Sequence, residues 1–173
     1  MELIPGFGYG RNAKIFSENG MDVTGIEISE TAIQLAKNHF NDDLKVFHGS
    51  VCAMPFDQEV YDGIYCYALL HLLNENERSK LLDDCYNQLR ENGIMVFIVV
   101  SKRDSKFGKG RAISKDRFEV MPGVSLFFYD TESINAEFAK YGLITAEEMD
   151  EPIIRVGHIP SQKFWQVICK KEE

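Results

Sequence analysis

The sequence has few cysteines, few prolines and no long hydrophobic run. Its four cysteines, Cys52, Cys66, Cys85 and Cys169, include no pair at the Cys-x-x-Cys spacing, so reduced, mostly buried thiols are expected and no metal site. No apolar stretch approaches the roughly 20 residues that span a bilayer. Met1 is followed directly by Glu-Leu-Ile, without the basic and apolar regions of a signal peptide. These absences predict a cytoplasmic protein with no membrane partner.

Positive charge is also scarce. The 173 residues include 19 lysines and arginines against 27 aspartates and glutamates, which gives a formal net charge of −8 at pH 7. A surface of this sign repels phosphate backbones at long range, so no nucleic-acid partner is expected. With 45% hydrophobic and 27% charged residues the composition is that of an ordinary globular protein, and the length fits a single domain over residues 1–173.

Short apolar runs alternate with segments of helical periodicity through the first hundred residues. Strands are expected at 3–5, 23–27, 44–47, 61–67 and 94–100, and helices at 12–19, 29–40 and 74–93. Ser29 and Asn74 are the expected N-caps of the second and third helices, and Gly93 is the expected end of the third. The entirely apolar run from 94 to 100 is typical of a central parallel strand covered on both faces. This alternation predicts an α/β doubly wound sheet.

The pattern changes after residue 100. Residues 101–123 show little periodicity and contain seven basic residues against three acidic ones, so a long, locally basic loop is expected there. A helix from about Ser133 to Lys140 is expected to end at Gly142, and two strands follow at 143–148 and 164–169.

Three glycines, Gly6, Gly8 and Gly10, occupy the turn between the first strand and the first helix. Residues without a Cβ let a ligand approach the backbone, and the free N–H groups at a helix start can bind an anion. Glu27 ends the second strand 17 residues after Gly10 and can accept hydrogen bonds from both hydroxyls of a ribose. Together these features predict an adenosine-type ligand at the carboxyl edge of the sheet. Alternatively, the glycines only shape a tight turn and Glu27 caps the helix that begins at Ser29.

Five motifs occur in an order that resembles the class I S-adenosylmethionine-dependent methyltransferases. The matching segments are 3–13 (LIPGFGYGRNA), 23–29 (VTGIEIS), 49–56 (GSVCAMPF), 61–71 (YDGIYCYALLH) and 89–93 (LRENG). The resemblance covers nearly the whole chain. It implies a Rossmann-like, doubly wound, mostly parallel seven-stranded sheet with helices on both faces and an antiparallel last strand. It also implies that the usual N-terminal cover helices are lacking, so we expect either a homodimer that covers the open cofactor cleft or weak cofactor binding.

The resemblance further implies which residues hold the cofactor, S-adenosylmethionine. The glycine turn would lie against the methionine part, whose carboxylate suits the positive end of the first helix. Glu27 would take the ribose hydroxyls, Ile28 would pack on the adenine, and Ser50 with the next backbone N–H would meet the adenine edge. Cys66 and Tyr67 would lie near the sulfonium. The implied cofactor-binding residues are Gly6, Phe7, Gly8, Gly10, Glu27, Ile28, Ser50, Val51, Cys66 and Tyr67.

His71 and Tyr129 are the candidate catalytic residues. His71 follows the fourth strand and has a pKa range that suits a general base, although a histidine that caps or packs the next helix explains it equally well. Residues 101–129, which comprise the basic loop and the segment up to Tyr129, stand where relatives place a substrate cap, and we expect them to recognise a polar or anionic small molecule. Methyltransferases that act on amino groups of nucleic-acid bases carry Asp/Asn-Pro-Pro-aromatic where this chain has the sequence CYAL at 66–69. This difference favours a small-molecule methyl acceptor.

Two other functions fit parts of the sequence. A nicotinamide-dependent oxidoreductase would use the same glycine turn and Glu27, but Arg11 stands where the dinucleotide motif has its third glycine, and no helix carries a Tyr-x-x-x-Lys. A degenerate, non-catalytic S-adenosylmethionine-binding or partner subunit also fits, because Ile4 and Ser50 replace residues that are usually acidic in the family. Methyl transfer from S-adenosylmethionine to a small molecule is the expected function.

Overall fold

A seven-stranded sheet in the order β3-β2-β1-β4-β5-β10-β9 forms the centre of the protein. The structure is a computed structural model that describes residues 1–40, 45–151 and 161–173. The strands of this sheet are β1 (Glu2–Pro5), β2 (Val23–Glu27), β3 (Lys45–His48), β4 (Tyr61–Tyr67), β5 (Leu89–Val100), β9 (Leu143–Glu151) and β10 (Gln162–Lys170). The first five strands pair in parallel, whereas β10 is antiparallel to both β5 and β9. The predicted fold class, including its antiparallel last strand, is confirmed.

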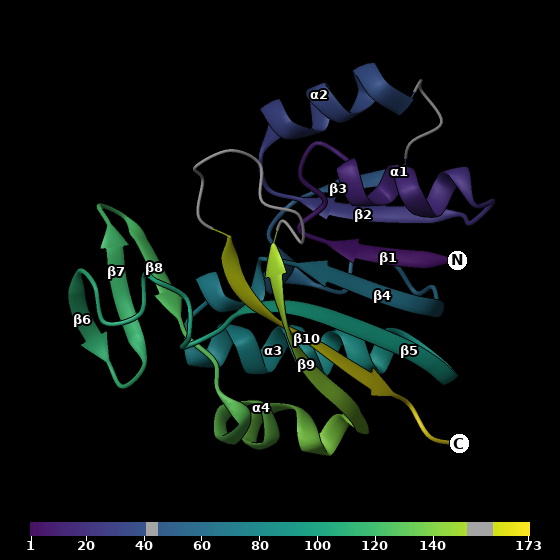
Figure 1. Cartoon of the computed structure of the whole chain (residues 1–173). Helices are drawn as coiled ribbons and strands as arrows, with labels where there is room; N and C mark the ends of the chain where they lie inside the picture. The colour runs from purple at the N-terminus through teal and green to yellow at the C-terminus, as the bar shows by residue number, and fades with distance from the viewer. Residues whose placement is uncertain (41–44, 152–160) are drawn as a thin grey trace.

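Helices cover both faces of this sheet (Figure 1). Helices α1 (Arg11–Glu18) and α2 (Glu30–Phe40) lie on one face, and α3 (Glu75–Gln88) and α4 (Thr131–Phe138) lie on the other. Three short 3-10 turns complete the helical elements of the described residues, namely η2 (Val51–Ala53), η3 (Leu70–Leu72) and η4 (Ala139–Tyr141). None of the helices in the described part of the chain is long and apolar enough to cross a membrane.

Local sequence signals set the starts of the second and third helices as predicted. Asn74 accepts a hydrogen bond from the Glu77 N–H at 3.0 Å, and the Glu77 carboxylate accepts one from the Asn74 N–H at 2.8 Å, which completes a capping box. The hydroxyl oxygen of Ser29 accepts a hydrogen bond from the Ala32 N–H at 3.2 Å. Gly142, with a φ of 71°, ends the helical segment after α4, also as predicted.

The prediction that the third helix ends at Gly93 is wrong. Helix α3 ends at Gln88, and β5 begins at the next residue, so Gly93 lies inside a strand. Asn92 has a φ of 62°, and a Cβ on Gly93 would lie 2.8 Å from the carbonyl oxygen of Arg90. The glycine therefore permits a tight bend near the start of β5 and does not end the helix.

The prediction of a long loop over residues 101–123 is also wrong. Strands β6 (Arg111–Ser114), β7 (Arg117–Met121) and β8 (Val124–Phe127) form an antiparallel sheet, called the small sheet below. It projects beyond the edge at which the parallel strands of the large sheet end (Figure 1). Two tight turns connect its strands, with Asp116 at a φ of 62° and Gly123 at 77°. Strands of four or five residues with little burial leave no clear alternation in the sequence, which explains the error.

The central strand and most of the cysteines are buried, as predicted. On β5, Met95, Phe97 and Val99 pack into the cluster that contains α3 and α4, whereas Ile98 and Val100 belong to a second cluster with the small sheet. All four cysteines are free thiols; three are buried, and the fourth, Cys52, is half-buried.

Candidate functional site

The glycine turn, residues 6–10, meets Glu27 at the carboxyl edge of the large sheet. Because β1 and β2 are parallel neighbours, the turn that follows β1 and the residue that ends β2 emerge side by side. The Gly8 N–H donates a hydrogen bond to one carboxylate oxygen of Glu27 at 2.7 Å, and the Ser29 N–H donates to the other at 2.8 Å. The structure thus brings together the two features that the sequence singled out.

The three glycines of this turn have different surroundings. All have a positive φ, of 73° at Gly6, 59° at Gly8 and 86° at Gly10. A Cβ at Gly6 would lie 2.9 Å from Leu69, and one at Gly10 would lie 2.5 Å from Phe40, but a Cβ at Gly8 would meet no atom within 4 Å. Gly6 and Gly10 therefore allow the turn to pack, whereas Gly8 faces open space. That space, next to the Glu27 carboxylate, fits a ligand that carries hydroxyl groups.

Phe7 takes part in this turn through its backbone only. Its side chain is buried in a cluster with Ala13 and Ala36, and its ring fills the space that a Cβ on Gly25 would occupy. The Phe7 N–H donates to the carbonyl of Ile26 at 3.0 Å, which holds the turn against the end of β2. The ring supports the turn from the core side.

The residues expected at the adenine surround the same edge. The Gly49 N–H donates to the Glu27 carbonyl at 2.9 Å, so the turn after β3 lies against the end of β2. Ile28 is 68% exposed and is available to pack on a flat ring. Ser50 accepts a hydrogen bond from the Cys52 N–H at 3.2 Å as the cap of η2, while the Val51 side chain is buried in the core.

Cys66 and Tyr67, at the end of β4, point to opposite faces of the sheet, as adjacent strand residues must. The Cys66 side chain is fully buried in the cluster with α3, where burial disfavours the thiolate and raises its pKa to about 12. That Cys66 lies near the sulfonium stays a prediction, which only its backbone can meet because the side chain is buried in the core. Tyr67 is half-buried on the other face, and its ring centroid is 5.2 Å from the guanidinium carbon of Arg11.

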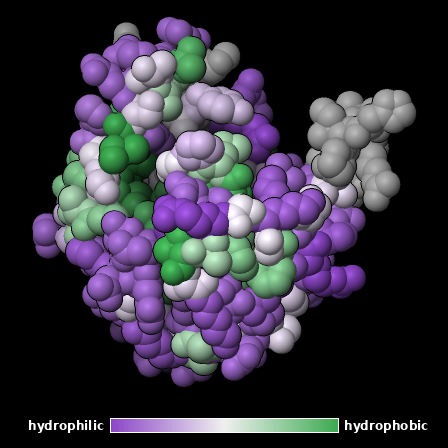
Figure 2. Space-filling model, turned by 90° about the vertical axis from the view of Figure 1, so that its left-hand side faces the viewer, coloured by the Kyte–Doolittle hydropathy of each residue, from purple (hydrophilic) through white to green (hydrophobic). Residues whose placement is uncertain are grey.

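Arg11 and Glu151 lie near Tyr67, and the sequence analysis did not name them as candidates. Burial is the main cause that raises the pKa of Tyr67; the nearby Arg11 lowers it, and the nearby Glu151 raises it. The ring of Tyr65 stacks near Tyr67 at 6.4 Å between centroids, and that of Phe164 lies at 6.2 Å. Figure 2 views the molecule from this end and shows hydrophobic side chains around a hollow between hydrophilic ones. Only the position of Arg11 in the glycine motif gave any signal in the sequence.

His71 does not have the geometry of a general base. Its side chain is 5% exposed, and its Nδ1 atom accepts a hydrogen bond from the backbone N–H of Val100 at 3.2 Å. Burial, followed by the positive charge of Lys106, lowers its pKa to about 4. The ring is therefore neutral with its proton on Nε2, and no lone pair is left to accept a proton from a substrate. The structure favours the packing role that the sequence analysis held open.

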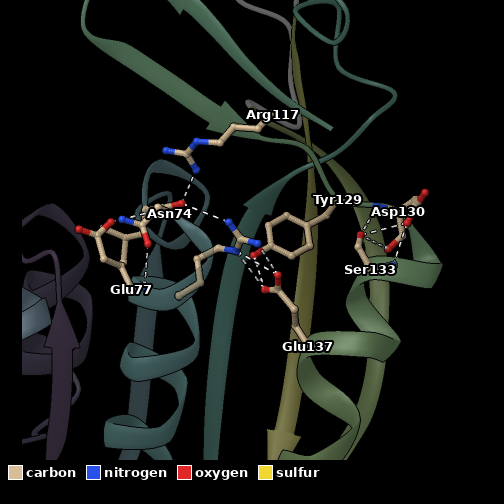
Figure 3. A network of polar contacts seen from close by, with 9 residues as sticks. Asn74, Glu77, Arg117, Tyr129, Asp130, Ser133 and Glu137 are labelled. Carbon is tan, nitrogen blue, oxygen red and sulfur yellow. Dashed lines mark hydrogen bonds and ion pairs between the residues drawn. The ribbon is translucent and has the colours of Figure 1, made fainter. Parts of the chain in front are cut away.

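Tyr129 lies in the core and not at a substrate surface. It is fully buried, and its hydroxyl donates a hydrogen bond to the Glu137 carboxylate at 2.8 Å (Figure 3). Burial, together with the negative charge of Glu137, raises its pKa well above the ordinary value. Its ring packs edge-on against Phe127 at 4.8 Å. This geometry corrects the expectation that Tyr129 contacts the methyl acceptor.

Comparison with known sequences matches residues 3–97 to the methyltransferase domain, which is more than half of the chain. The tRNA N(3)-methylcytidine methyltransferase Mettl2 of Drosophila melanogaster is 21% identical over 164 residues, which cover 87% of this chain and 50% of that protein. The chain therefore spans about half the length of this curated relative.

Solved structures share the fold over almost the whole chain. A methyltransferase from Methanosarcina mazei has a TM-score of 0.82 at 13% identity, covering 99% of this chain and 92% of that one. The 1,6-didemethyltoxoflavin-N1-methyltransferase of Burkholderia thailandensis, solved with 1,6-didemethyltoxoflavin and S-adenosylhomocysteine, has a TM-score of 0.77 at 16% identity and coverages of 99% and 71%. The glycine turn, Glu27 and the family match lead to one conclusion: the chain belongs to the methyltransferase-domain family of class I methyltransferases, and its cofactor is S-adenosylmethionine.

Proposed function

We propose that the protein transfers a methyl group from S-adenosylmethionine to a small-molecule acceptor. The observation that carries this proposal is the 2.7 Å contact between the Gly8 N–H and the Glu27 carboxylate, beside open space at the carboxyl edge of the sheet. When bound, the cofactor supplies an electrophilic methyl group. The protein then needs to align the two reactants and exclude water, and it needs no nucleophilic side chain.

Glu27 has the capacity to bind the ribose. An ionised carboxylate offers about four lone-pair positions, and two of those on Glu27 are used by the N–H groups of Gly8 and Ser29. Two positions remain for the two ribose hydroxyls. The two backbone hydrogen bonds also fix the orientation of the carboxylate before the ligand arrives, which lowers the entropic cost of binding.

The other proposed cofactor contacts follow from the positions of the neighbouring residues. Ile28 packs on the adenine, Ser50 and the Val51 N–H meet the adenine edge, and Tyr67 lies beside the reacting methyl group. The glycine turn supplies backbone atoms for the methionine part from Gly6, Phe7, Gly8 and Gly10.

The acceptor is proposed to approach over Tyr67. The Tyr67 hydroxyl, with Arg11 and Glu151 nearby, offers a polar group on an otherwise aromatic surface. The net charge of −8 favours a small molecule over a nucleic acid. Because the Drosophila relative is a tRNA methyltransferase, tRNA is the acceptor class to test against this proposal. We also propose that a second copy of this chain covers the cofactor cleft and forms a homodimer.

Calorimetry with S-adenosylhomocysteine tests the cofactor site. We expect Glu27→Ala to weaken binding at least tenfold, since charge-assisted hydrogen bonds contribute about 1.5 to 3 kcal/mol each. Glu27→Gln, which keeps an acceptor oxygen for the turn, should fold normally and still bind more weakly. Glu30→Gln, an exposed residue in the first turn of α2, is the matched control. Equal affinity in wild type and both Glu27 variants would refute the site, and binding of NADH instead would point to an oxidoreductase.

A transfer assay tests the acceptor. The protein is incubated with S-adenosylmethionine labelled in the methyl group and with either the small-molecule fraction of a cell extract or purified tRNA. Label in a small molecule that separates from S-adenosylmethionine by chromatography, and that is absent without the protein, supports the proposal, and label in tRNA contradicts it. Binding of S-adenosylhomocysteine without transfer to either pool would favour the non-catalytic subunit.

A further inference from the structure

The segment that joins β4 to α3, residues 68–73, is called the β4–α3 connection here. It begins with Ala68 at a φ of 54°, a conformation that residues with a Cβ rarely adopt. The next residue, Leu69, packs so closely on the glycine turn that a Cβ at Gly6 would lie 2.9 Å from its Cδ2 atom. The glycine turn therefore packs against the β4–α3 connection through Leu69.

Two arginines from different elements hold the end of this connection. Arg117, on β7 of the small sheet, donates a hydrogen bond to the Leu72 carbonyl at 2.9 Å and another to the Leu73 carbonyl. Arg78, on α3, donates to the same Leu73 carbonyl at 3.2 Å. Figure 3 shows Arg117 reaching from the small sheet toward Asn74, the N-cap of α3. These contacts satisfy carbonyls at the end of η3 that have no helical partner.

The two arginines differ in what else binds them. Arg78 is 4% exposed, forms an ion pair with Glu137 at 2.7 Å, and lies 4.0 Å from the centroid of the Phe127 ring. Arg117 forms no ion pair within residues 1–40, 45–151 and 161–173, and its hydrogen bonds there go to the two carbonyls of the connection. Burial, and then the nearby charge of Arg78, lowers the pKa of Arg117. Its guanidinium is therefore partly buried against the connection.

The small sheet and the glycine turn are linked by a short chain of contacts. Arg117 holds the carbonyls of Leu72 and Leu73, and the Leu72 N–H donates back to the Leu69 carbonyl at 2.9 Å. Leu69 in turn lies against Gly6. A shift of the small sheet would therefore move the connection and the support of the turn together.

We propose that Arg117 is a positioning residue that couples the small sheet to the cofactor site. This inference rests on the proposed function, because it takes the glycine turn as the place where S-adenosylmethionine binds. The coupling is reciprocal: a molecule that binds one position of the small sheet more tightly than another would change the affinity for the cofactor, and the cofactor would change the affinity for that molecule by the same factor.

Three arginine variants test the coupling. Arg117→Ala removes all the donors, Arg117→Lys keeps the charge with a single donor group, and Arg111→Ala removes an exposed arginine of the same sheet that pairs with Glu119 at 2.8 Å. For each we would measure the dissociation constant of S-adenosylhomocysteine, the midpoint of urea unfolding, and amide hydrogen exchange in residues 6–10 and 68–73. We expect Arg117→Ala to weaken binding about fivefold or more and to increase exchange in both segments. Arg117→Lys should lie between Arg117→Ala and wild type, and Arg111→Ala should match wild type.

The outcomes separate this inference from the proposed function. No binding of S-adenosylhomocysteine by the wild-type protein would refute the cofactor site itself. Normal binding by Arg117→Ala, with or without a lower unfolding midpoint, would overturn the coupling and leave Arg117 with a purely structural role. If Arg117→Ala does not fold, Arg117→Lys decides: weaker binding at an unchanged midpoint supports the coupling, and unchanged binding overturns it.

Discussion

The Nδ1 atom of His71 accepts a hydrogen bond from the backbone N–H of Val100 at 3.2 Å, which ties the β4–α3 connection to the end of β5. This contact needs a neutral ring with a free lone pair on Nδ1. Protonation of His71 would break the hydrogen bond and place a charge in a site that is 5% exposed. The residue that the sequence offered as a base is therefore a structural group whose neutrality matters to folding.

Stability should depend on pH through His71. Its pKa is about 4 in the folded protein, against an ordinary value of 6.5, so the unfolded chain takes up the proton first as the pH falls. The contribution is fully present above about pH 6.5 and is lost as the pH falls toward 4. Between pH 7 and pH 5 we expect wild type to lose about 2 kcal/mol more unfolding free energy than His71→Gln does. Urea unfolding at several pH values measures this difference.

The matched control for this prediction is His48→Gln. His48 is exposed, and its Nε2 atom lies 3.1 Å from the Ile28 carbonyl oxygen. This variant should show the pH dependence of wild type. An identical slope in wild type and His71→Gln would show that the buried ring does not control acid stability.

Alanine substitutions at Gly8 and Gly20 separate two effects: the loss of stability from backbone strain and the loss of binding from a blocked cofactor site. Both have a positive φ, of 59° and 78°, and a Cβ at either would meet no atom within 4 Å. Each alanine substitution should therefore lower the unfolding free energy by about 1 kcal/mol. Only Gly8→Ala should weaken S-adenosylhomocysteine binding in calorimetry, because only its Cβ enters the space next to Glu27. Equal binding by the two variants would mean that the cofactor does not approach Gly8.

Arg78 and Glu137 form a largely buried ion pair under the small sheet, and Tyr129 also donates to this carboxylate. Arg78→Met should lower the unfolding free energy by about 3 kcal/mol, because it leaves the Glu137 charge without its partner. The double variant Arg78→Met with Glu137→Met should recover part of this loss. Lys14→Met, which breaks an exposed pair with Glu18 at 3.7 Å, should change stability by less than about 0.5 kcal/mol. If the double variant were no more stable than the single one, the loss would come from packing and not from the unpaired charge.

Asp130 is the N-cap of α4, and its carboxylate makes two contacts whose contributions can be separated by substitution. Its carboxylate accepts a hydrogen bond from the Ser133 N–H at 2.9 Å and forms an ion pair with Lys102 at 2.5 Å. Asp130→Ala removes both and should cost about 1 kcal/mol of unfolding free energy, since N-caps have this value. Asp130→Asn keeps the cap, so urea unfolding should show less than half of that loss. A loss of equal size in the two variants would assign the effect to the ion pair.

The large sheet could be predicted because its strands carry their signal locally. The limits of β2 and β4 agree with the predicted 23–27 and 61–67 to the residue, since apolar runs end there at turns. The capping box at Asn74 and Glu77 depends on residues three apart and needs no knowledge of the fold. The strands of the small sheet are short and partly exposed, so their sequence resembles that of a loop.

The direction of individual side chains could not be predicted in the same way. Cys66 and Tyr67 are neighbours in sequence, and which of them faces the edge depends on the register of β4 against β1 and β5. Arg11, Tyr67 and Glu151 come from three separate parts of the chain, and they meet only after β9 has joined the sheet beyond β10. The meeting of Gly8 with Glu27 needs only the parallel pairing of two successive strands, which is why the sequence could place these two residues side by side.

The place of β10 between β5 and β9 also sets the order in which the chain can complete its fold during synthesis. Residues 94–100 of β5 pair with 164–170 of β10, and β9 can join the sheet only through β10. A ribosome that has released residues 1–151 therefore presents a nascent chain in which one edge of an apolar strand carries unpaired N–H and C=O groups. Such an edge is a template for pairing with other chains. The nine residues of β10 therefore cover an edge of β5 that could otherwise pair with other chains.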